Sequence, residues 1–352
     1  MAIFSISGIK LTGISACVPK NELSNWDYDL LTKSEQKLLI KTTGIEKRRI
    51  ATSGLATSDL CYTSAVNLLK KLEIDSQEIG LIIFVSQSPD YFLPATSIIL
   101  QDRLGLKKTA IAFDINLGCS GYTYGLSVIS SLMSSTKIKK ALLLTGDISS
   151  FSLNIKDKST YPLFGDAGTA TLLEYDQASP PIHFNVQSDG SGYQSIIIRD
   201  GGVRNPMSQN SFKENEIEKG ITTSRRNLSL NGSDIFNFSL REVPSNILNL
   251  LSFANEDIDS YNYFVMHQAN KLLNESIRKK LKVDSDKVPY SLDRYGNTSS
   301  ASIPLTIVSE LSNKLRVGKS KLILSGFGVG LSWASVLLST ENLVCTNILE
   351  YE

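Results

Sequence analysis

The sequence predicts an α/β fold built from two similar halves, and three observations support this. Leu81–Val85 is an unbroken apolar run of the kind found in strands that are buried on both faces. Ser58–Leu72 has apolar residues at helical spacing, so strands and helices alternate along the chain. The third observation is that the same order of elements occurs twice, which is typical of a duplicated unit.

The second half repeats the first in element order and pattern more than in residue identity. Tyr261–Met266 corresponds to Leu81–Val85 as a short apolar strand. Lys319–Gly330 resembles Lys139–Ser149, because both begin with lysines, continue as an apolar strand and end in a glycine-containing turn. This correspondence predicts two α/β units that pack against each other.

We expect an N-terminal half at residues 1–178 and a C-terminal half at residues 179–352. If the halves pack as a pseudo-dimer, their equivalent strand-to-helix turns meet centrally, and sites in such sheets lie at strand ends. Gly201–Ser233 is polar and has little periodicity. This segment is either a surface excursion or a flap over the site.

The composition argues against several classes of function. Lys and Arg total 36 against 35 for Asp and Glu, so no global basic field attracts nucleic acid. The four cysteines lack CxxC spacing, which argues against a zinc site or a disulfide framework and fits a reducing compartment. Neither a signal-peptide pattern nor an apolar run of about 18 residues is found. We expect a cytoplasmic protein that binds neither nucleic acid nor membrane.

Cys119 is the first candidate for chemistry, because it lies where a predicted strand turns sharply into a predicted helix. Ile111–Ile115 alternates as a strand, Gly118 interrupts it, and Tyr122–Met133 has apolar residues at helical spacing. A thiol at the first turn of a helix faces unpaired N–H groups, and there its pKa falls to between about 3.5 and 7.5. The alternative is that Cys119 is a small buried apolar residue, as most free cysteines are.

Histidine is rare in this chain, which contains only His183 and His267. His183 has no nearby polar cluster, and we interpret it as an incidental strand residue. His267 ends an apolar strand in a second-half turn that should face the Cys119 turn, and Asn297 lies in a third turn. A lone histidine or a turn asparagine is often structural. If the three turns meet, however, the Cys119 thiolate, a neutral His267 imidazole and the Asn297 amide donor would together form a nucleophilic site.

Gly326–Gly330 (GFGVG) has glycine spacing that superficially fits dinucleotide binding. The residues that follow, LSWASVLL, are predicted to form a returning strand and not the helix of a βαβ unit, so the dinucleotide fingerprint is not met. Glycines also let a backbone approach a ligand closely and direct an N–H group at it. That is the geometry of an oxyanion hole.

Together these motifs resemble the 3-oxoacyl-(acyl-carrier-protein) synthase III family of the thiolase superfamily, over nearly the whole chain. The resemblance is carried by TGIEKRRIA at Thr43, PDYFLPATS at Pro89, DINLGCSGY at Asp114, FGDAGTA at Phe164, HQAN at His267, GNTSSAS at Gly296 and SGFGVGLSW at Ser325. It implies a thiolase-like fold whose duplicated halves form a five-layer αβαβα arrangement. The N-terminal half then carries the nucleophilic Cys, and the C-terminal half carries His and Asn.

The resemblance implies an acyltransferase that works in two stages without a metal or cofactor. Cys119 accepts an acyl group from a thioester primer on CoA or an acyl carrier protein. His267 and Asn297 then donate hydrogen bonds to the thioester carbonyl of a malonyl-carrier, which stabilises the enolate formed as CO₂ leaves. The enolate attacks the acyl-Cys119 carbonyl, whose oxyanion is held by the N–H groups of Cys119 and Val329. The product is a 3-oxoacyl thioester, as in fatty acid biosynthesis.

The resemblance also implies partners and further site residues. Leu93 and Phe327 correspond to the acyl pocket. Arg278, Lys279 and Lys280 form a basic group near the place where relatives dock the acidic acyl carrier protein. These three residues could equally complement the C-terminal dipole of a helix in solvent. The family expectation for the assembly is a homodimer.

The chain departs from well-known relatives at positions that bear on the primer. A Trp and an Arg before the TGI motif clamp the CoA adenine in those relatives, whereas Leu38 and Thr42 occupy these positions here. Leu93 replaces an aromatic residue that often closes the acyl pocket, so we expect a primer longer than acetyl. Val329 replaces a common Gly, and a β-branched residue disfavours positive φ, so we expect a slightly reshaped loop. The missing clamp favours a specialised lipid, polyketide or surface-glycan pathway over housekeeping fatty-acid initiation.

Two other functions remain open. An acyltransferase of the same fold would move the acyl group to an alcohol or amine without condensation, and it would not need an enolate site at His267 and Asn297. A non-catalytic partner subunit of a heterodimer would not need the three reactive residues at all. A thiolase is disfavoured, because Cys345 lies beyond the last predicted strand and has no glycine context.

Overall fold

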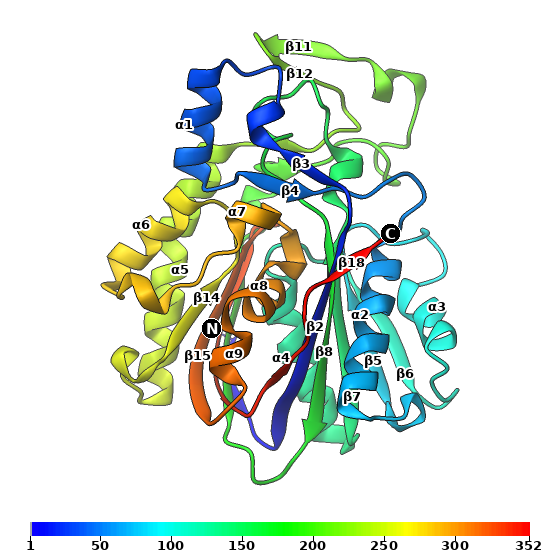
Figure 1. Cartoon of the computed structure of the whole chain (residues 1–352), viewed down its shortest axis with the longest axis vertical. Coiled ribbons are helices and arrows are strands. Elements are labelled where there is room, and N and C mark those ends of the chain that lie inside the picture. The colour runs from blue at the N-terminus through cyan, green and yellow to red at the C-terminus, as the bar shows by residue number, and fades with distance from the viewer. Residues whose placement is uncertain (1) are drawn as a thin grey trace.

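The computed structural model describes residues 2–352 and shows two β-sheets with helices between them and on their outer faces (Figure 1). The strands of the larger sheet are β2 (Ile9–Pro19), β5 (Leu81–Val85), β6 (Ile111–Ile115), β7 (Lys140–Asp147), β8 (Ala167–Tyr175), β17 (Val344–Cys345) and β18 (Leu349–Tyr351). They lie in the order β17-β2-β8-β7-β5-β6, and β18 also pairs with β2.

The smaller sheet comes mainly from the second half of the chain. Its strands are β1 (Ala2–Ile6), β9 (Ile182–Ser188), β14 (Tyr263–Met266), β15 (Lys319–Gly328) and β16 (Ser332–Glu341). They lie in the order β1-β9-β16-β15-β14, and β14 is parallel to β15. The strand predicted at 261–266 is therefore present as β14.

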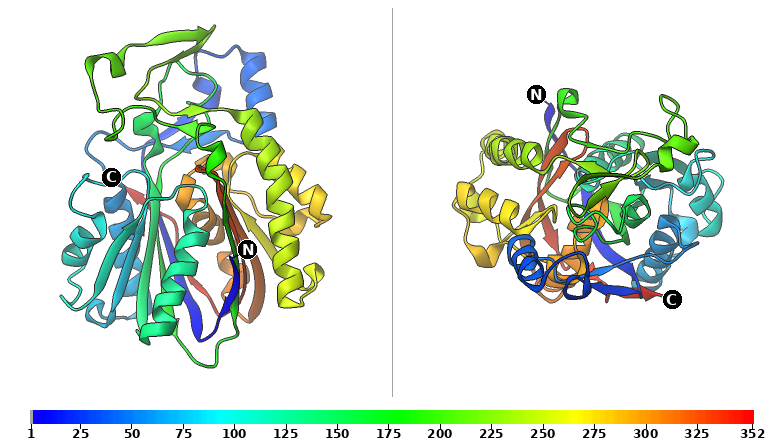
Figure 2. Two further views of the ribbon diagram at one scale, coloured as in Figure 1. Left: turned by 180° about the vertical axis from the view of Figure 1, so that it is seen from behind. Right: turned by 90° about the horizontal axis from the view of Figure 1, so that it is seen from above.

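Helices form three layers around the two sheets (Figures 1 and 2). The outer helices are α2 (Thr57–Leu72) and α3 (Thr96–Arg103) on the larger sheet and α5 (Gly232–Ala254) and α6 (Lys271–Leu281) on the smaller one. The central helices are α4 (Gly121–Thr136) and α8 (Ser302–Thr306), the latter continuing through Ile307–Leu311 to α9 (Ser312–Leu315). The thiolase-like five-layer αβαβα arrangement is confirmed. Within residues 2–352, no helix combines the length and the apolar character needed to cross a membrane.

Side-chain alternation explains why the sheets are covered on both faces. Along β5, Ile83 and Val85 face the central helices and join one apolar cluster, whereas Ile82 and Phe84 join a second cluster with α2 and α3. An unbroken apolar strand is stable only where both of its faces are buried. The C-terminal end of β5 therefore lies between two helix layers. The polar residues Ser86–Ser88 follow it directly in the chain.

The two sheets exchange strands at the ends of the chain. β1 pairs with β9, with Ala2 opposite Val186, and so joins the sheet of the second half. β17 and β18 return to β2, with Val344 opposite Gly13. The chain passes between the sheets after β8, close to the predicted boundary at 178. The predicted halves therefore share strands at both termini, and neither forms its sheet alone.

Residues outside the five layers form a cap at one end of the molecule (Figure 1). Its elements are β3 (Glu22–Ser24), α1 (Lys33–Thr43), β4 (Lys47–Arg49), β10 (Ile196–Ile197), β11 (Asn215–Glu218), β12 (Ile221–Thr223), β13 (Ser229–Leu230) and α7 (Leu292–Tyr295). Of the predicted excursion at 201–233, the β11–β12 hairpin projects at the surface. Leu228 and Leu230 at its base line the cavity described below, so the excursion is both a surface segment and a wall of the site.

Candidate active site

One cavity between the two halves brings together the residues that the sequence predicted to react. Cys119, His267, Asn297, Phe327 and Val329 all line it. Its volume is about 160 Å³, comparable with an engineered protein cavity of about 150 Å³ that holds benzene. The convergence predicted from three distant turns is therefore present, and the cavity has room for a small acyl group.

Cys119 is 7% exposed and lies two residues before α4, with Ser120 as the N-cap. Burial raises the pKa of its thiol to about 11, although the N–H groups of Val329 and of Cys119 itself act to lower it. The predicted fall in the thiol pKa is wrong for this resting site. The cause is desolvation, which disfavours the charged thiolate more than the neighbouring N–H donors favour it.

The approach of the GFGVG loop to the sulfur depends on Gly328. A Cβ at this position would lie 2.6 Å from the Cβ atom of Cys119 and 2.8 Å from Sγ, so no other residue fits without displacement. The N–H of the next residue, Val329, consequently faces the thiol, as an oxyanion donor must. Positive φ falls on Gly328 and Gly330 and not on Val329 between them, so the β-branched side chain of Val329 does not force the predicted change in the loop.

His267 ends β14 and is held as a neutral imidazole. It is 1% exposed, and burial lowers its pKa to about 3. Its Nδ1 lies 2.7 Å from the hydroxyl oxygen of Ser302, and its ring packs edge-on against Phe327. When the Ser302 hydroxyl donates to Nδ1, the ring proton is on Nε2, which makes Nε2 a hydrogen-bond donor.

Asn297 is held so that its amide group is also a donor toward the cavity. Ser299 N–H donates to the side-chain oxygen of Asn297 at 3.0 Å, which leaves Nδ2 as the free end of the carboxamide. Asn297 N–H donates to the carbonyl of Leu163 at 2.9 Å, and Gly165 N–H donates to the carbonyl of Asn297 at 3.0 Å. Hydrogen bonds therefore join the GNTSSAS motif to the segment at 163–165, and they hold the backbone of Asn297 in place. The bond from Ser299 N–H then sets the direction of the Asn297 carboxamide.

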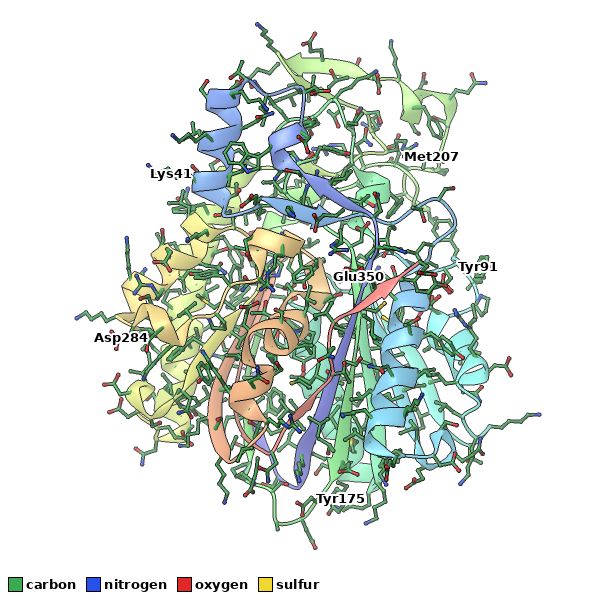
Figure 3. All side chains as sticks on the ribbon, viewed as in Figure 1. Lys41, Tyr91, Tyr175, Met207, Asp284 and Glu350 are labelled. Carbon is green, nitrogen blue, oxygen red and sulfur yellow. The ribbon has the colours of Figure 1, made fainter. Side chains whose placement is uncertain are left out.

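The two residues predicted for the acyl pocket lie in different places. Phe327 is 1% exposed and lines the cavity beside His267. Leu93 is 86% exposed and is not part of the cavity wall. Its loop runs outward after the Pro89 turn, and Tyr91 from the same loop lies at the outer edge of the molecule (Figure 3). Leu93 therefore does not close the pocket within a single chain.

The basic group on α6 lies at the end of the helix that follows His267, as predicted, and two of its three residues also make contacts within the chain. Arg278 pairs with Glu275 at 2.8 Å and donates to the carbonyl of Val283 at 2.7 Å. Lys280 donates to a backbone carbonyl of α5, and Lys279 is exposed. These residues lie in the last turn of α6, whereas the cavity is lined by Asn270 and Leu273 at its start. The basic group therefore lies outside the cavity wall, and its role in carrier docking stays a prediction.

Asp147 and Ser299 are among the polar residues of the cavity wall that sequence reasoning missed. Asp147 ends β7, is 2% exposed and accepts hydrogen bonds from turns of both halves. Its place after a buried strand was a usable signal, because strand ends carry sites in such sheets. Ser299 lies within the GNTSSAS motif, but its φ of 50° appears only in the structure.

A thiol, an imidazole, a carboxamide and a loop N–H that meet between the halves of this five-layer fold define a thiolase-fold condensing enzyme. Comparison with known proteins identifies the family. The model of the 3-oxoacyl-[acyl-carrier-protein] synthase III family matches residues 113–190, and the model of the C-terminal part of the same family matches residues 251–340. The two matches contain Cys119 and the pair His267 and Asn297, respectively.

Curated relatives and solved structures agree with the family models. The beta-ketoacyl-[acyl-carrier-protein] synthase III 2 of Staphylococcus epidermidis is 34% identical over 334 residues, which cover 94% of this chain and 97% of that one. A 3-oxoacyl-(acyl-carrier protein) synthase structure from Burkholderia xenovorans superimposes with a TM-score of 0.92 at 35% identity, covering 99% of both chains. The chain belongs to the 3-oxoacyl-[acyl-carrier-protein] synthase III family and is an acyltransferase of the condensing type.

A more distant structure shares the fold alone. The priming beta-ketosynthase of the R1128 polyketide pathway superimposes with a TM-score of 0.80 at 23% identity, covering 96% of this chain and 97% of that one. Members of this fold therefore tolerate large changes in sequence while the layers are retained.

Proposed function

We propose that this protein transfers an acyl group from a thioester primer to Cys119 and then condenses it with a malonyl-carrier to give a 3-oxoacyl thioester and CO₂. One observation carries the proposal. The carboxamide of Asn297 is turned so that its N–H₂ end, and not its oxygen, is free beside Cys119 and His267. An enolate site needs donors, whereas simple acyl transfer to an alcohol or amine does not.

In the first stage the Cys119 sulfur attacks the primer carbonyl. The thiol is protonated at neutral pH because its pKa is raised to about 11, so its proton leaves as the S–C bond forms. The departing primer thiolate takes up a proton, and the net proton count does not change. The N–H groups of Cys119 and Val329 stabilise the oxyanion that forms between these two events.

In the second stage the malonyl thioester loses CO₂ and its electron pair moves into the thioester carbonyl as an enolate. His267 and Asn297 donate hydrogen bonds to that oxygen, and neither carries a charge, since the pKa of His267 is lowered to about 3. The enolate carbon then attacks the acyl-Cys119 carbonyl. The S–C bond of the acyl-enzyme breaks, and the Cys119 thiolate takes up one proton from solvent, which is the proton that the overall condensation consumes.

The primer is proposed to be longer than acetyl, within a pathway for a specialised lipid, polyketide or surface glycan. Apolar side chains from the cap, including Ile196, Leu228 and Leu230, extend the cavity beyond Cys119. Leu38 is 64% exposed on α1 and offers no aromatic face for an adenine ring. These features support a primer that is delivered by an acyl carrier protein or by CoA bound in another way.

The proposed partners are an acyl carrier protein and a second copy of this chain in a homodimer. The reaction is proposed to need no metal or cofactor, because the chain supplies the nucleophile and the donors. All four cysteines are free thiols in the structure, which supports the proposal of a reducing cytoplasmic location.

Intact-protein mass spectrometry with a panel of acyl-CoA and acyl-carrier thioesters tests the first stage and identifies the primer. The expected result is one acyl adduct on Cys119. Adding malonyl-carrier should remove this adduct and release CO₂. Transfer of the acyl group to an alcohol or amine with no CO₂ would favour the acyltransferase alternative. Absence of any adduct with every thioester would favour the non-catalytic subunit.

A further inference from the structure

Asp147 is a buried carboxylate in the cavity wall that the proposed reaction leaves unused. It ends β7 and is 2% exposed. Its Oδ1 accepts hydrogen bonds from the N–H of Gln87 at 2.7 Å and the hydroxyl of Ser86 at 3.1 Å. Its Oδ2 accepts from Ser300, whose hydroxyl lies at 2.7 Å and whose N–H lies at 3.1 Å. Four donors from two turns therefore converge on one side chain.

Both oxygens of Asp147 must accept a hydrogen bond, because the backbone N–H groups of Gln87 and Ser300 can only donate. A carboxylate has four lone-pair sites on two oxygens and no proton of its own. An asparagine at the same position would offer one oxygen, and its N–H₂ would face either the Gln87 N–H or the Ser300 N–H. Burial raises the pKa of Asp147, and the hydrogen bonds from Gln87 and Ser300 oppose that rise. Both backbone N–H donors therefore favour the ionised form.

The first oxygen of Asp147 fixes the turn behind the nucleophile. Gln87 follows β5, and its side-chain oxygen lies against Gly118, where an added Cβ would be only 2.5 Å away. Gly118 directly precedes Cys119. The hydrogen bond from Gln87 N–H to Asp147 therefore holds a residue that packs against the Cys119 turn.

The second oxygen fixes the turn that carries the amide donor. Ser299 has φ of 50°, a left-handed conformation that costs free energy for any residue except glycine. It is anchored on both sides, because its own N–H donates to Asn297 Oδ1 at 3.0 Å and the next N–H, that of Ser300, donates to Asp147. Loss of the Asp147 anchor would release the strained residue, and the orientation of the Asn297 carboxamide would be lost with it.

We propose that Asp147 is a positioning residue for decarboxylation: its carboxylate clamps the Ser300 turn of one half to the Gln87 turn of the other and so holds Asn297 in the cavity that Cys119 also lines. This inference rests on the proposed function. The negative charge of Asp147 also acts to raise the pKa of Cys119, which opposes thiolate formation.

The test compares Asp147→Asn with Asp166→Asn as a matched control. Asp166 is fully buried and accepts hydrogen bonds from Ala51 N–H and from Ser150, but it does not line the cavity. Three rates are measured for each full-length variant: formation of acyl-Cys119 by intact mass, CO₂ release from malonyl-carrier by the acylated enzyme, and alkylation of Cys119 by iodoacetamide across pH.

For Asp147→Asn we expect kcat for CO₂ release to fall by about 100-fold, with KM changed less than about threefold, because the donor is misplaced in the transition state. We also expect the midpoint of Cys119 alkylation to move to lower pH, because a negative charge beside the thiol has been removed. The other titratable groups facing these two residues are His267, which is neutral, and Cys61, whose thiol pKa is raised by burial. Asp166→Asn should leave the alkylation midpoint unchanged.

Two results would overturn the inference. One is an Asp147→Asn variant that releases CO₂ within about threefold of the wild-type rate. The other is an equal loss of acyl transfer and CO₂ release with no shift in the alkylation midpoint, which is the result expected of a general folding defect. A wild-type protein that forms acyl-Cys119 but never releases CO₂ would instead overturn the proposed function.

If Asp147→Asn does not fold, Ser300→Ala takes its place. This substitution removes the hydroxyl that donates to Asp147 at 2.7 Å and keeps both the carboxylate and the backbone N–H. The expected result is a loss of about tenfold in CO₂ release, with the alkylation midpoint unchanged because the charge remains. Wild-type CO₂ release by Ser300→Ala would overturn the inference by itself.

Discussion

The two central helices both begin at the active-site cavity, but the turns before them are held in different ways. Cys119 precedes α4, which is a regular helix from Gly121 to Thr136. Asn297 precedes α8 through a turn that contains Ser299 at positive φ, and the helical path then changes to a π-helix at Ile307–Leu311. The first turn is shaped by the close approach of a glycine loop, and the second by hydrogen bonds to a strained backbone.

The two turns that line the cavity are therefore positioned by different interactions. The nucleophile turn depends on space, because Gly328 leaves room for the Cys119 sulfur and for the N–H of Val329. The donor turn depends on polar anchors, because Asn297 and Asp147 hold the residues on either side of the strain at Ser299. Substitutions in the two turns should therefore affect different stages of the reaction.

The largest effect is expected from Cys119→Ala. Without the sulfur no acyl-enzyme forms, and condensation should fall by at least about 10³-fold. Intact mass after incubation with an acyl thioester measures the adduct, and Cys345→Ala, which should keep the adduct, is the control for other thiols. Full condensing activity in Cys119→Ala would contradict the assignment of the nucleophile.

Asn297→Ala should affect the second stage only. Loss of one preorganised donor typically costs about 10²–10³ in rate, so CO₂ release should fall by that factor while acyl-Cys119 still forms. The two stages are measured separately, by mass and by CO₂ release. An equal loss in both would mean that the two turns are not independent.

Gly328→Ala should impair acyl transfer by about tenfold or more. The added methyl group would lie 2.6 Å from Cys119 Cβ, so the loop must move. The Val329 N–H would then no longer point at the oxyanion. Gly190→Ala is the matched control, because a Cβ there meets nothing within 4 Å. Acyl-enzyme formation at the wild-type rate in Gly328→Ala would show that the close approach is unimportant.

The pH dependence of the two turns should also differ. Thiolate is the reactive form of Cys119, so its alkylation should rise about tenfold per pH unit toward a midpoint near pH 11. His267 has its pKa lowered to about 3 and stays neutral above that pH, so it should produce no inflection in CO₂ release between about pH 5 and 8. An alkylation midpoint below pH 8 would show that the helix N-terminus outweighs burial after all.

The smallest effect is expected at the far end of α6. Charge reversal at Lys279 and Lys280 should change KM for malonyl-carrier by less than about threefold, because these residues lie away from the cavity. Initial rates at varied carrier concentration measure this. A rise in KM of tenfold or more would instead support the carrier-docking role that the sequence predicted.

Much of the site could be predicted because its residues stand at breaks in pattern. Cys119 and His267 each follow a strand of continuous or alternating apolar residues, and Asn297 follows a glycine. Such breaks mark strand ends, where an α/β sheet places its functional groups. The acyl pocket was less accessible to this reasoning, since the exposure of Leu93 depends on the path of a loop and not on its local pattern.

The pKa values were the least predictable feature. The position of Cys119 near a helix start suggested a lowered value, but the opposite direction follows from enclosure by residues distant in sequence, such as Phe327 and His267. Desolvation depends on every group that excludes water from the thiol, so its effect on the pKa cannot be predicted from a local motif.

The sequence by itself determined the duplicated α/β layers and the family, and it predicted the three candidate site residues, because hydrophobic period and turn residues act locally and can be read along the chain. Only the tertiary structure decided the exchange of terminal strands, the outward path of the Leu93 loop and the clamp at Asp147. These features depend on contacts between residues far apart in the chain, where burial and the satisfaction of hydrogen bonds are settled by the whole packed molecule.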